Sequence, residues 1–219
     1  MDKSDPIKGV SMTDKGRQMT DVVADFVVEH CGNQLGYCVE AGAYDGILEN
    51  TTLALEQLGW TCLCIEPNPQ AFQTLIKNRS LCLEYALAEE KKDNVPFALY
   101  SKKRGGHEAS FSAFEVDETL ETLWAVPFSK MKRRDVIVNV QTLDFCLDLV
   151  KFPRLDVFSL DVEGWEMEVL KGFDMARWRP KVIVMENIFK DTNLSNYIKG
   201  FGYKYIKRYR VNNFYVRKE

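Results

Sequence analysis

The chain has 219 residues, of which 46% are apolar and 28% charged, a composition typical of one soluble globular domain. Its 29 Lys and Arg against 32 Asp and Glu give a net charge of -3, which argues against bulk polyanion binding but leaves room for a local basic patch. The first 18 residues lack the pattern of a signal peptide, and charges interrupt every long apolar run, so we expect a cytoplasmic protein with no membrane partner.

Apolar periodicity predicts the order of elements along the first half of the chain. Val22, Val23, Phe26 and Val27 recur at three- and four-residue spacing, which predicts an amphipathic helix over 14–31 in an N-terminal helical segment, 1–35. Short apolar runs then alternate with helical stretches. We expect strands at 36–41, 61–66 and 82–88, and helices at 50–58 and 69–78.

The same alternation resumes near residue 155. We expect a strand at 155–161, a helix at 165–171 closed by Gly172, a strand at 181–186, and two final strands, 203–208 and 213–217, with a tight turn at Asn212 and Asn213. Such alternation indicates βαβ units and a parallel sheet covered on both faces. Residues 90–140 break the rhythm, and we interpret them as a substrate-covering insertion within a single domain, 1–219.

Six cysteines are present, and none of them shows the paired spacing of a zinc site. Four of them lie in or beside strand-like segments: Cys38, Cys62, Cys64 and Cys82. We interpret them as buried free thiols in a reducing compartment, with disulfides or redox chemistry as the alternative.

Two strand ends carry the pattern of a nucleoside site. The first strand runs into a glycine-containing turn, Glu40 to Gly46, where the backbone can approach a ligand closely. Glu66 ends the second strand, 26 residues after Glu40, where a carboxylate can accept hydrogen bonds from both ribose hydroxyls. Either feature alone is weak, because a strand-end carboxylate is often merely solvated. Together they predict a nucleoside-containing cofactor.

The turn favours S-adenosylmethionine over a dinucleotide. The dinucleotide fingerprint needs a second glycine beside the pyrophosphate, and Tyr44 stands at that place. The carboxylate of Glu40 suits a cationic cofactor and would repel a diphosphate.

Five segments together resemble the FkbM family of methyltransferases: VEAGAYDG at 39–46, CIEPNP at 64–69, TLD at 142–144, FSLDVEGWEMEVLKG at 158–172 and RPKVIVMEN at 179–187. The resemblance spans roughly residues 36–190. It implies the α/β class I methyltransferase (Rossmann-like) fold, with a seven-stranded, mostly parallel sheet, its last strand antiparallel, and an insertion before strand four. It also implies O-methylation of a sugar or another small hydroxylated molecule.

The resemblance further implies which residues surround the cofactor. Glu40, Gly42 and Gly46 would surround the methionine part and Glu66 the ribose, with Ala86 as a neighbour of the adenine. Asn50 and Thr51 open the first helix after the turn, where they can receive the cofactor carboxylate. The cofactor-binding set that we predict is Glu40, Gly42, Ala43, Tyr44, Asp45, Gly46, Asn50, Thr51, Glu66, Pro67, Ala86 and Asp161.

Asp161 and Glu163 end the fourth strand of the predicted fold, where methyl group and acceptor meet. The enzyme must bring the acceptor oxygen to the methyl carbon and help to remove the hydroxyl proton, and a carboxylate at Asp161 suits that need. The alternative is that Asp161 only caps the following turn. His107, in the insertion, is a second candidate base, although a lone loop histidine is usually a bystander.

A metal site is a further hypothesis. Glu186 and Asn187 end the fifth strand, next to Asp161 on the fourth, and two carboxylates with an amide are the kind of oxygen ligands that suit Mg²⁺. The alternative is that these side chains only form hydrogen bonds in the pocket.

Two other functions remain open at this point. One is N-methylation of an amine or a nucleic acid, and the other is a non-catalytic protein that binds S-adenosylmethionine. The tail from 203 to 218 interleaves aromatic with basic residues, which can grip single-stranded nucleic acid. A solvated basic face of an antiparallel pair explains the same pattern, so nucleic acid is not the partner that we expect.

Overall fold

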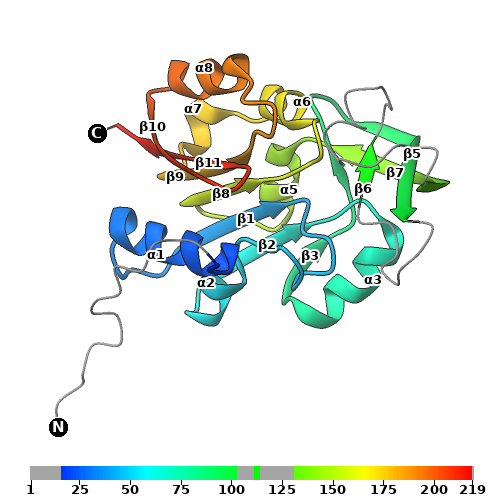
Figure 1. Cartoon of the computed structure of the whole chain (residues 1–219), viewed down its shortest axis with the longest axis horizontal. Coiled ribbons are helices and arrows are strands. Elements are labelled where there is room, and N and C mark those ends of the chain that lie inside the picture. Colours follow the sequence, from blue (N-terminus) through cyan, green and yellow to red (C-terminus); the bar gives the residue numbers. More distant parts are fainter. Residues whose placement is uncertain (1–15, 103–110, 114–130, 219) are drawn as a thin grey trace, which may run out of the picture.

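A seven-stranded sheet forms the centre of the computed structural model, which describes residues 16–102, 111–113 and 131–218 (Figure 1). The strands lie in the order β3-β2-β1-β8-β9-β11-β10. All neighbouring pairs are parallel except those of β11, which runs antiparallel to both β9 and β10. The bounds are β1 Tyr37–Ala41, β2 Thr61–Ile65, β3 Leu81–Leu83, β8 Val157–Leu160, β9 Val182–Glu186, β10 Tyr203–Tyr209 and β11 Asn212–Arg217. The predicted mostly parallel sheet with an antiparallel last strand is confirmed.

Helices cover both faces of this sheet (Figure 1). On one face α1 (Met19–Cys31), α2 (Leu53–Gln57) and α3 (Pro69–Asn78) pack on side chains such as Cys38, Cys62 and Cys64. On the other face lie α5 (Leu143–Leu149), α6 (Glu166–Lys171), α7 (Met175–Trp178) and α8 (Thr192–Gly200). Apolar side chains point to both faces of the central strands, which is why these strands read as continuous apolar runs.

A second sheet lies between β3 and β8 in the chain, where the sequence predicts an insertion. Its order is β4-β7-β5-β6, built from β4 Ala86–Leu87, β5 Lys92–Lys102, β6 Phe111–Ala113 and β7 Met131–Gln141. Long antiparallel pairing of β5 with β7 dominates it. The described residues therefore place the insertion as predicted, and its substrate-covering role stays a prediction.

Several predicted boundaries are wrong. The single strand predicted at 82–88 is divided, because β3 pairs with β2 whereas β4 pairs with β7 in the second sheet. The final turn lies at Arg210 and Val211, two residues before the asparagines, which instead begin β11. The helix predicted from residue 50 begins at Leu53. The helix α8 has no counterpart among the sequence-based expectations.

Two buried cysteines on neighbouring strands are bonded to each other. Cys38 and Cys62 occupy the same register position of β1 and β2, with Cα atoms 4.7 Å apart, and form a disulfide. For this pair the expectation of free thiols is wrong, because parallel in-register strands bring their side chains together on one face. Cys64 and Cys82 are free and face each other across β2 and β3. Among the described residues, no helix combines the length and the apolar character that crossing a bilayer requires.

Candidate active site

The turn after β1 is held against the neighbouring strands. The N–H groups of Gly42 and Ala43 both donate to the carbonyl oxygen of Ile65 at the end of β2, at 2.9 and 3.1 Å. Gly42 has a φ of 83°, and a Cβ there would overlap the carbonyl oxygen of Asp161. Only glycine fits, because the ends of β1 and β8 touch at this residue. Glycine at this position therefore lets the end of β1 approach the end of β8, and the predicted contact of Gly42 with the methionine part of the cofactor stays a prediction.

Glu66 is placed as the prediction requires. Its side chain is buried after β2, and its two oxygens accept the N–H groups of Tyr44 and Asn68, each at 2.8 Å. Burial raises the pKa of this carboxyl to about 7, although the hydrogen bonds from the two N–H groups lower the pKa in part. Each carboxylate oxygen has a second lone pair, so an oriented acceptor remains for hydroxyl donors.

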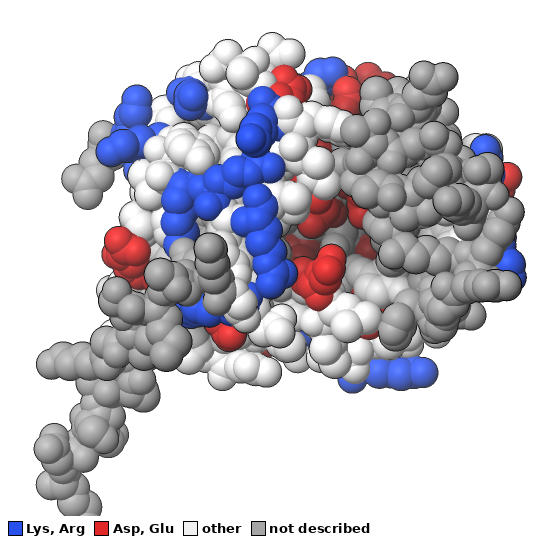
Figure 2. Space-filling view, viewed as in Figure 1, with Lys and Arg blue, Asp and Glu red and all other residues white. Residues whose placement is uncertain are grey.

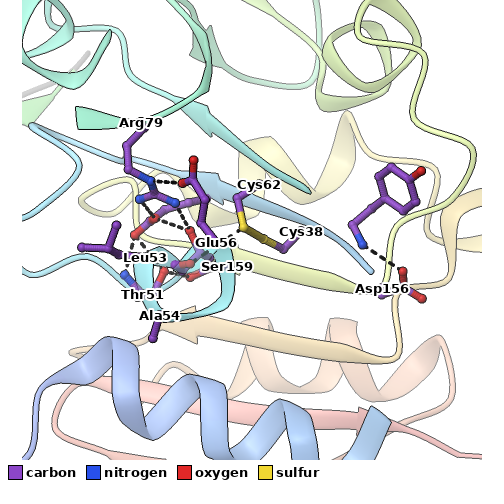
Figure 3. Close-up of a disulfide and its surroundings, with 12 residues drawn as sticks. Cys38, Thr51, Leu53, Ala54, Glu56, Cys62, Arg79, Asp156 and Ser159 are labelled. Carbon is purple, nitrogen blue, oxygen red and sulfur yellow. Dashed lines mark hydrogen bonds and ion pairs between the residues drawn. A yellow bond between two sulfur atoms is a disulfide. The ribbon is translucent and has the colours of Figure 1, made fainter. Parts of the chain in front are cut away.

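Glu40 is buried and bonds to a polar network, of which Figure 3 shows Thr51, Glu56 and Arg79 beside the disulfide. Its Oε1 accepts the N–H and the hydroxyl of Thr51, at 2.5 and 2.8 Å, and its Oε2 accepts the hydroxyl of Thr52 at 2.6 Å. Arg79 Nη1 forms an ion pair with Oε2 at 3.1 Å and also pairs with Glu56. The carboxylate is thus neutralised from within the protein and shapes the site, and its predicted contact with the cofactor stays a prediction.

The remaining predicted cofactor residues divide into turn residues and core residues. Asp45 accepts the N–H groups of Ile47 and Leu48, at 2.9 and 2.8 Å, and so fixes the end of the turn. Asn50 bonds within the same loop, to Ile47 and Leu53, and lies before α2 instead of in its first turn. Pro67 follows Glu66 and is half-buried.

Ala86 lies apart from the turn. It pairs with Val140 in the second sheet and is buried among Phe97, Val138 and Trp165. With 2% of its surface exposed, it presents little to a ligand, and its predicted place beside the adenine stays untested.

Asp161 and Glu186 form a carboxyl pair at the ends of β8 and β9. A side-chain hydrogen bond joins them, which requires a shared proton. Burial, followed by the negative charge of Glu166, raises the pKa of Asp161 from 3.8 to about 7. Burial and the charge of Asp161 raise the pKa of Glu186 still further. Because both pKa values are raised, the pair retains a proton at neutral pH.

Two more carboxylates follow β8. Glu166, at the start of α6, is buried and accepts the N–H groups of Val162 and Gly164, both at 3.2 Å, so it shapes the turn after Asp161. Glu163 is half-buried in that turn with a φ of 55°, and its negative charge acts on Glu186. The structure thus brings Asp161, Glu163 and Glu186 together, and their predicted roles on the acceptor side stay a prediction.

Figure 2 shows acidic side chains gathered in a hollow at the side of the molecule where, in Figure 1, β1 and β2 end. The carboxyl ends of parallel strands are where open α/β sheets bind ligands. Cofactor turn and carboxyl pair lie at the same edge of the sheet, because β8 is the neighbour of β1.

The metal hypothesis receives no support from the described residues. They hold no group of three or more His, Cys, Asp or Glu side chains arranged for a metal ion. The amide of Asn187 is used locally, since its Oδ1 accepts the N–H of Asp191 at 2.7 Å and its Nδ2 donates to the Asp191 carbonyl at 3.0 Å. Asn187 therefore shapes the loop before α8 and is not presented as a ligand.

Sequence reasoning missed three side chains that organise the site: Arg79, Ser159 and Glu166. Arg79 follows a helix and belongs to no recognisable motif. Only the fold shows that it forms an ion pair with Glu40. Ser159 lies 2.7 Å from the hydroxyl of Thr51, inside an apolar run that gave no sign of a polar contact. Glu166 had one signal, its place in the first turn of a helix. His107 lies outside the described residues.

Comparison with known proteins agrees with this geometry. The model of the methyltransferase FkbM domain matches residues 40–205. A protein from Beauveria bassiana named Methyltransferase 1 is 25% identical over 126 residues, which are 54% of this chain and 51% of that protein. The chain thus spans about half the length of this relative.

The fold has a counterpart among solved structures. A crystal structure of a methyltransferase FkbM from Methylobacillus flagellatus KT has a TM-score of 0.52 and 16% sequence identity, covering 84% of this chain and 44% of that one. At that identity the likeness concerns the fold alone, which is that of the class I methyltransferases.

Proposed function

The chain belongs to the FkbM methyltransferase family, and from that premise we propose that it transfers a methyl group from S-adenosylmethionine to a hydroxyl oxygen of a sugar or another small molecule. The observation that carries the proposal is that a candidate ribose-binding carboxylate and a candidate base lie at the same edge of the sheet. An oriented buried carboxylate, Glu66, ends β2, and a proton-sharing carboxyl pair, Asp161 and Glu186, ends β8 and β9.

The residues at the first site fit the cofactor that the family implies. Glu66 would hold the ribose hydroxyls, and the turn after β1, which the N–H groups of Gly42 and Ala43 fix to β2, would lie beside the methionine part. When bound there, the cofactor supplies a methyl group on a positively charged sulfur. The carboxylates around the hollow favour a cation at this place electrostatically.

The carboxyl pair supplies what O-methylation needs. An acceptor hydroxyl becomes a competent nucleophile as its proton leaves, and Asp161 in its ionised form can take that proton while the new carbon–oxygen bond forms. Glu186 donates its own hydrogen bond to Asp161 and orients the carboxylate. Glu163 can accept a second hydroxyl and so align the acceptor. No Lys or Arg among the described residues forms an ion pair with Asp161 or Glu186, so Asp161 remains basic.

Two measurements test the proposal. Purified protein with S-adenosylmethionine and a panel of sugars is expected to form S-adenosylhomocysteine and a methyl ether. Calorimetric affinity for S-adenosylhomocysteine is expected to fall by about tenfold or more in Glu66→Ala, since two charge-assisted hydrogen bonds are lost. The control is Glu29→Ala, which removes an exposed carboxylate on α1. Equal affinity in all three proteins would overturn the cofactor site.

The alternatives make different predictions in the same assay. Product on an amine or on an oligonucleotide, with none on hydroxyl compounds, would indicate N-methylation. Tight cofactor binding without any product would indicate a binding protein. The carboxyl pair favours O-methylation, because a hydroxyl oxygen is a weak nucleophile until a base takes its proton, whereas a neutral amine is nucleophilic without one.

A further inference from the structure

Four of the six cysteines lie on one face of three neighbouring strands. Cys38 of β1 pairs in register with Cys62 of β2, and two residues further along β2 Cys64 pairs in register with Cys82 of β3. Residues two apart on a strand point to the same face, so both pairs lie on the face that α1, α2 and α3 cover. The first pair is a disulfide, and the second is a pair of free thiols.

The free pair has the backbone geometry that a disulfide needs. Neighbouring strands lie about 4.8 Å apart, and disulfides join Cα atoms that are about 4.4–6.8 Å apart. The bonded pair, with 4.7 Å between its Cα atoms, shows that in-register positions of this sheet meet the requirement. Cys64 and Cys82 occupy equivalent positions, and a hydrogen bond already joins their side chains. A second disulfide can therefore close without any change of strand register.

The two pairs differ in their access to solvent. Cys38 and Cys62 are both buried in the core, so their disulfide is shielded from reagents. Cys64 is buried as well, but Cys82 is half-buried, and its thiol donates to the carbonyl oxygen of Arg79 at 3.6 Å. Because thiol–disulfide exchange requires access to the attacking sulfur, the second pair can react from solvent through Cys82.

The accessible thiol is also the more acidic one. The hydrogen bond from Cys64 and the positive charge of Arg79 lower the pKa of the Cys82 thiol, although partial burial opposes them. The same hydrogen bond, followed by burial, raises the pKa of Cys64. The thiolate is the nucleophile in exchange with disulfides, so Cys82 is suited to attack an oxidant and Cys64 to resolve the mixed disulfide.

We propose that Cys64 and Cys82 form a reversible redox site, which a small disulfide such as oxidised glutathione converts to a second cross-strand disulfide. The thiolate of Cys82 attacks one glutathione sulfur, and the first glutathione leaves as a thiolate that takes up the proton lost by Cys82. Cys64 then loses its proton and attacks Sγ of Cys82, and the second glutathione leaves with that proton. Two cysteine thiols are thus oxidised while one glutathione disulfide is reduced to two thiols. This chemistry is independent of methyl transfer.

Thiol labelling of the native full chain in glutathione buffers tests the proposal. After incubation with reduced glutathione, iodoacetamide added with denaturant is expected to label the free cysteines Cys31, Cys64, Cys82 and Cys146. After incubation with oxidised glutathione, labelling of Cys64 and Cys82 is expected to be lost together, to return with reduced glutathione, and to be replaced by a cross-linked peptide pair in mass spectra. Cys31 is the internal control, since it is also half-buried but burial raises its pKa, so we expect it to react several-fold more slowly.

Two variants separate the roles of the cysteines. Cys64→Ser is expected to retain glutathione on Cys82, because no resolving thiol remains, whereas Cys82→Ser is expected to keep Cys64 fully labelled in oxidised glutathione. Unchanged labelling of both cysteines in the wild type would overturn the redox site. It would also be overturned by glutathione that stays on Cys82 of the wild type, by loss of Cys31 labelling at the same rate, or by a cross-link that forms only in urea.

Discussion

Carboxylates lie at the ends of the sheet strands in two regions, and the two regions differ in the partners that the protein supplies to them. At the end of β1, Glu40 receives three hydrogen bonds from threonines and an ion pair from Arg79. At the ends of β8 and β9, burial raises the pKa values of Asp161 and Glu186, and no Lys or Arg in the described part of the chain forms an ion pair with either. Carboxylates on the neighbouring strands β1 and β8 thus differ in whether described protein groups neutralise their charge.

The difference shows which carboxylate can do chemistry. A carboxylate whose partners are all supplied by the protein gains nothing from a ligand, and it serves to fix the turn above it. A carboxyl pair with raised pKa values has a proton to exchange near neutral pH. The contacts of Glu40 show that it supports the turn after β1, and we propose Asp161 as the reactive group.

The largest expected effect is on catalysis. Asp161→Asn keeps the size of the side chain but cannot accept a proton, so we expect the rate to fall by about 10²–10⁴-fold. His107→Ala is expected to cost much less. Initial rates of S-adenosylhomocysteine formation, with folding verified by circular dichroism, check both. A large loss in His107→Ala with a near-normal Asp161→Asn would reverse the assignment.

The next largest effect is on stability. Arg79→Met removes the cation beneath Glu40 and leaves its carboxylate buried, so we expect about 3–5 kcal/mol of unfolding free energy to be lost. Urea denaturation measures it. Adding Glu40→Gln to the same protein should restore part of the loss, because the uncompensated charge is gone. An unchanged midpoint in Arg79→Met would show that the two regions do not differ in this way.

The disulfide in the same region is expected to contribute less to the free energy of unfolding. Cys38 and Cys62 enclose a loop with a sequence separation of 24, and cross-links of this kind stabilise by about 2–4 kcal/mol. Replacing both by alanine, or reducing the wild type, is expected to lower the urea midpoint accordingly. Cys64→Ala is the control, since its thiol is also buried but is not bonded. Equal losses in the two variants would assign the effect to packing.

The smallest effect is a pH dependence. The pKa of Asp161 rises from 3.8 in the unfolded chain to about 7 in the folded protein, which therefore binds the extra proton between these values. The stability that this group contributes decreases as pH rises from about 4 to about 7, whereas its ability to act as a base increases. We expect activity to rise through about pH 7. The fall in stability should be smaller in Asp161→Asn, and an identical fall would contradict the coupling.

The sequence predicts the sheet well because its signals are local. Continuous apolar runs ending in a glycine turn or a carboxylate mark β1, β2, β8 and β9, and these elements lie within one or two residues of the prediction. The run at 82–88 could not be divided in this way, because the two halves differ only in which sheet they join.

For the candidate site, the placement of Glu66 and Asp161 directly after strand ends was predictable, because it depends only on where the apolar runs end. A role was not predictable where it depends on partners from distant segments. Arg79 reaches Glu40 across 39 residues of sequence, and this contact decides that Glu40 is a framework group. The local bonds of Asn187 to Asp191 likewise decide against a metal ligand, and the residue types alone gave no sign of them.

Gly42 has a consequence for how this enzyme can be modified. Because its backbone rests on the carbonyl of Asp161, the turn that we propose for the donor and the strand end that we propose for the acceptor are in direct contact at this glycine. Engineering a new acceptor preference by moving the end of β8 would displace the turn that serves the donor. The β1–β8 junction is therefore the part of the molecule to leave alone in redesign.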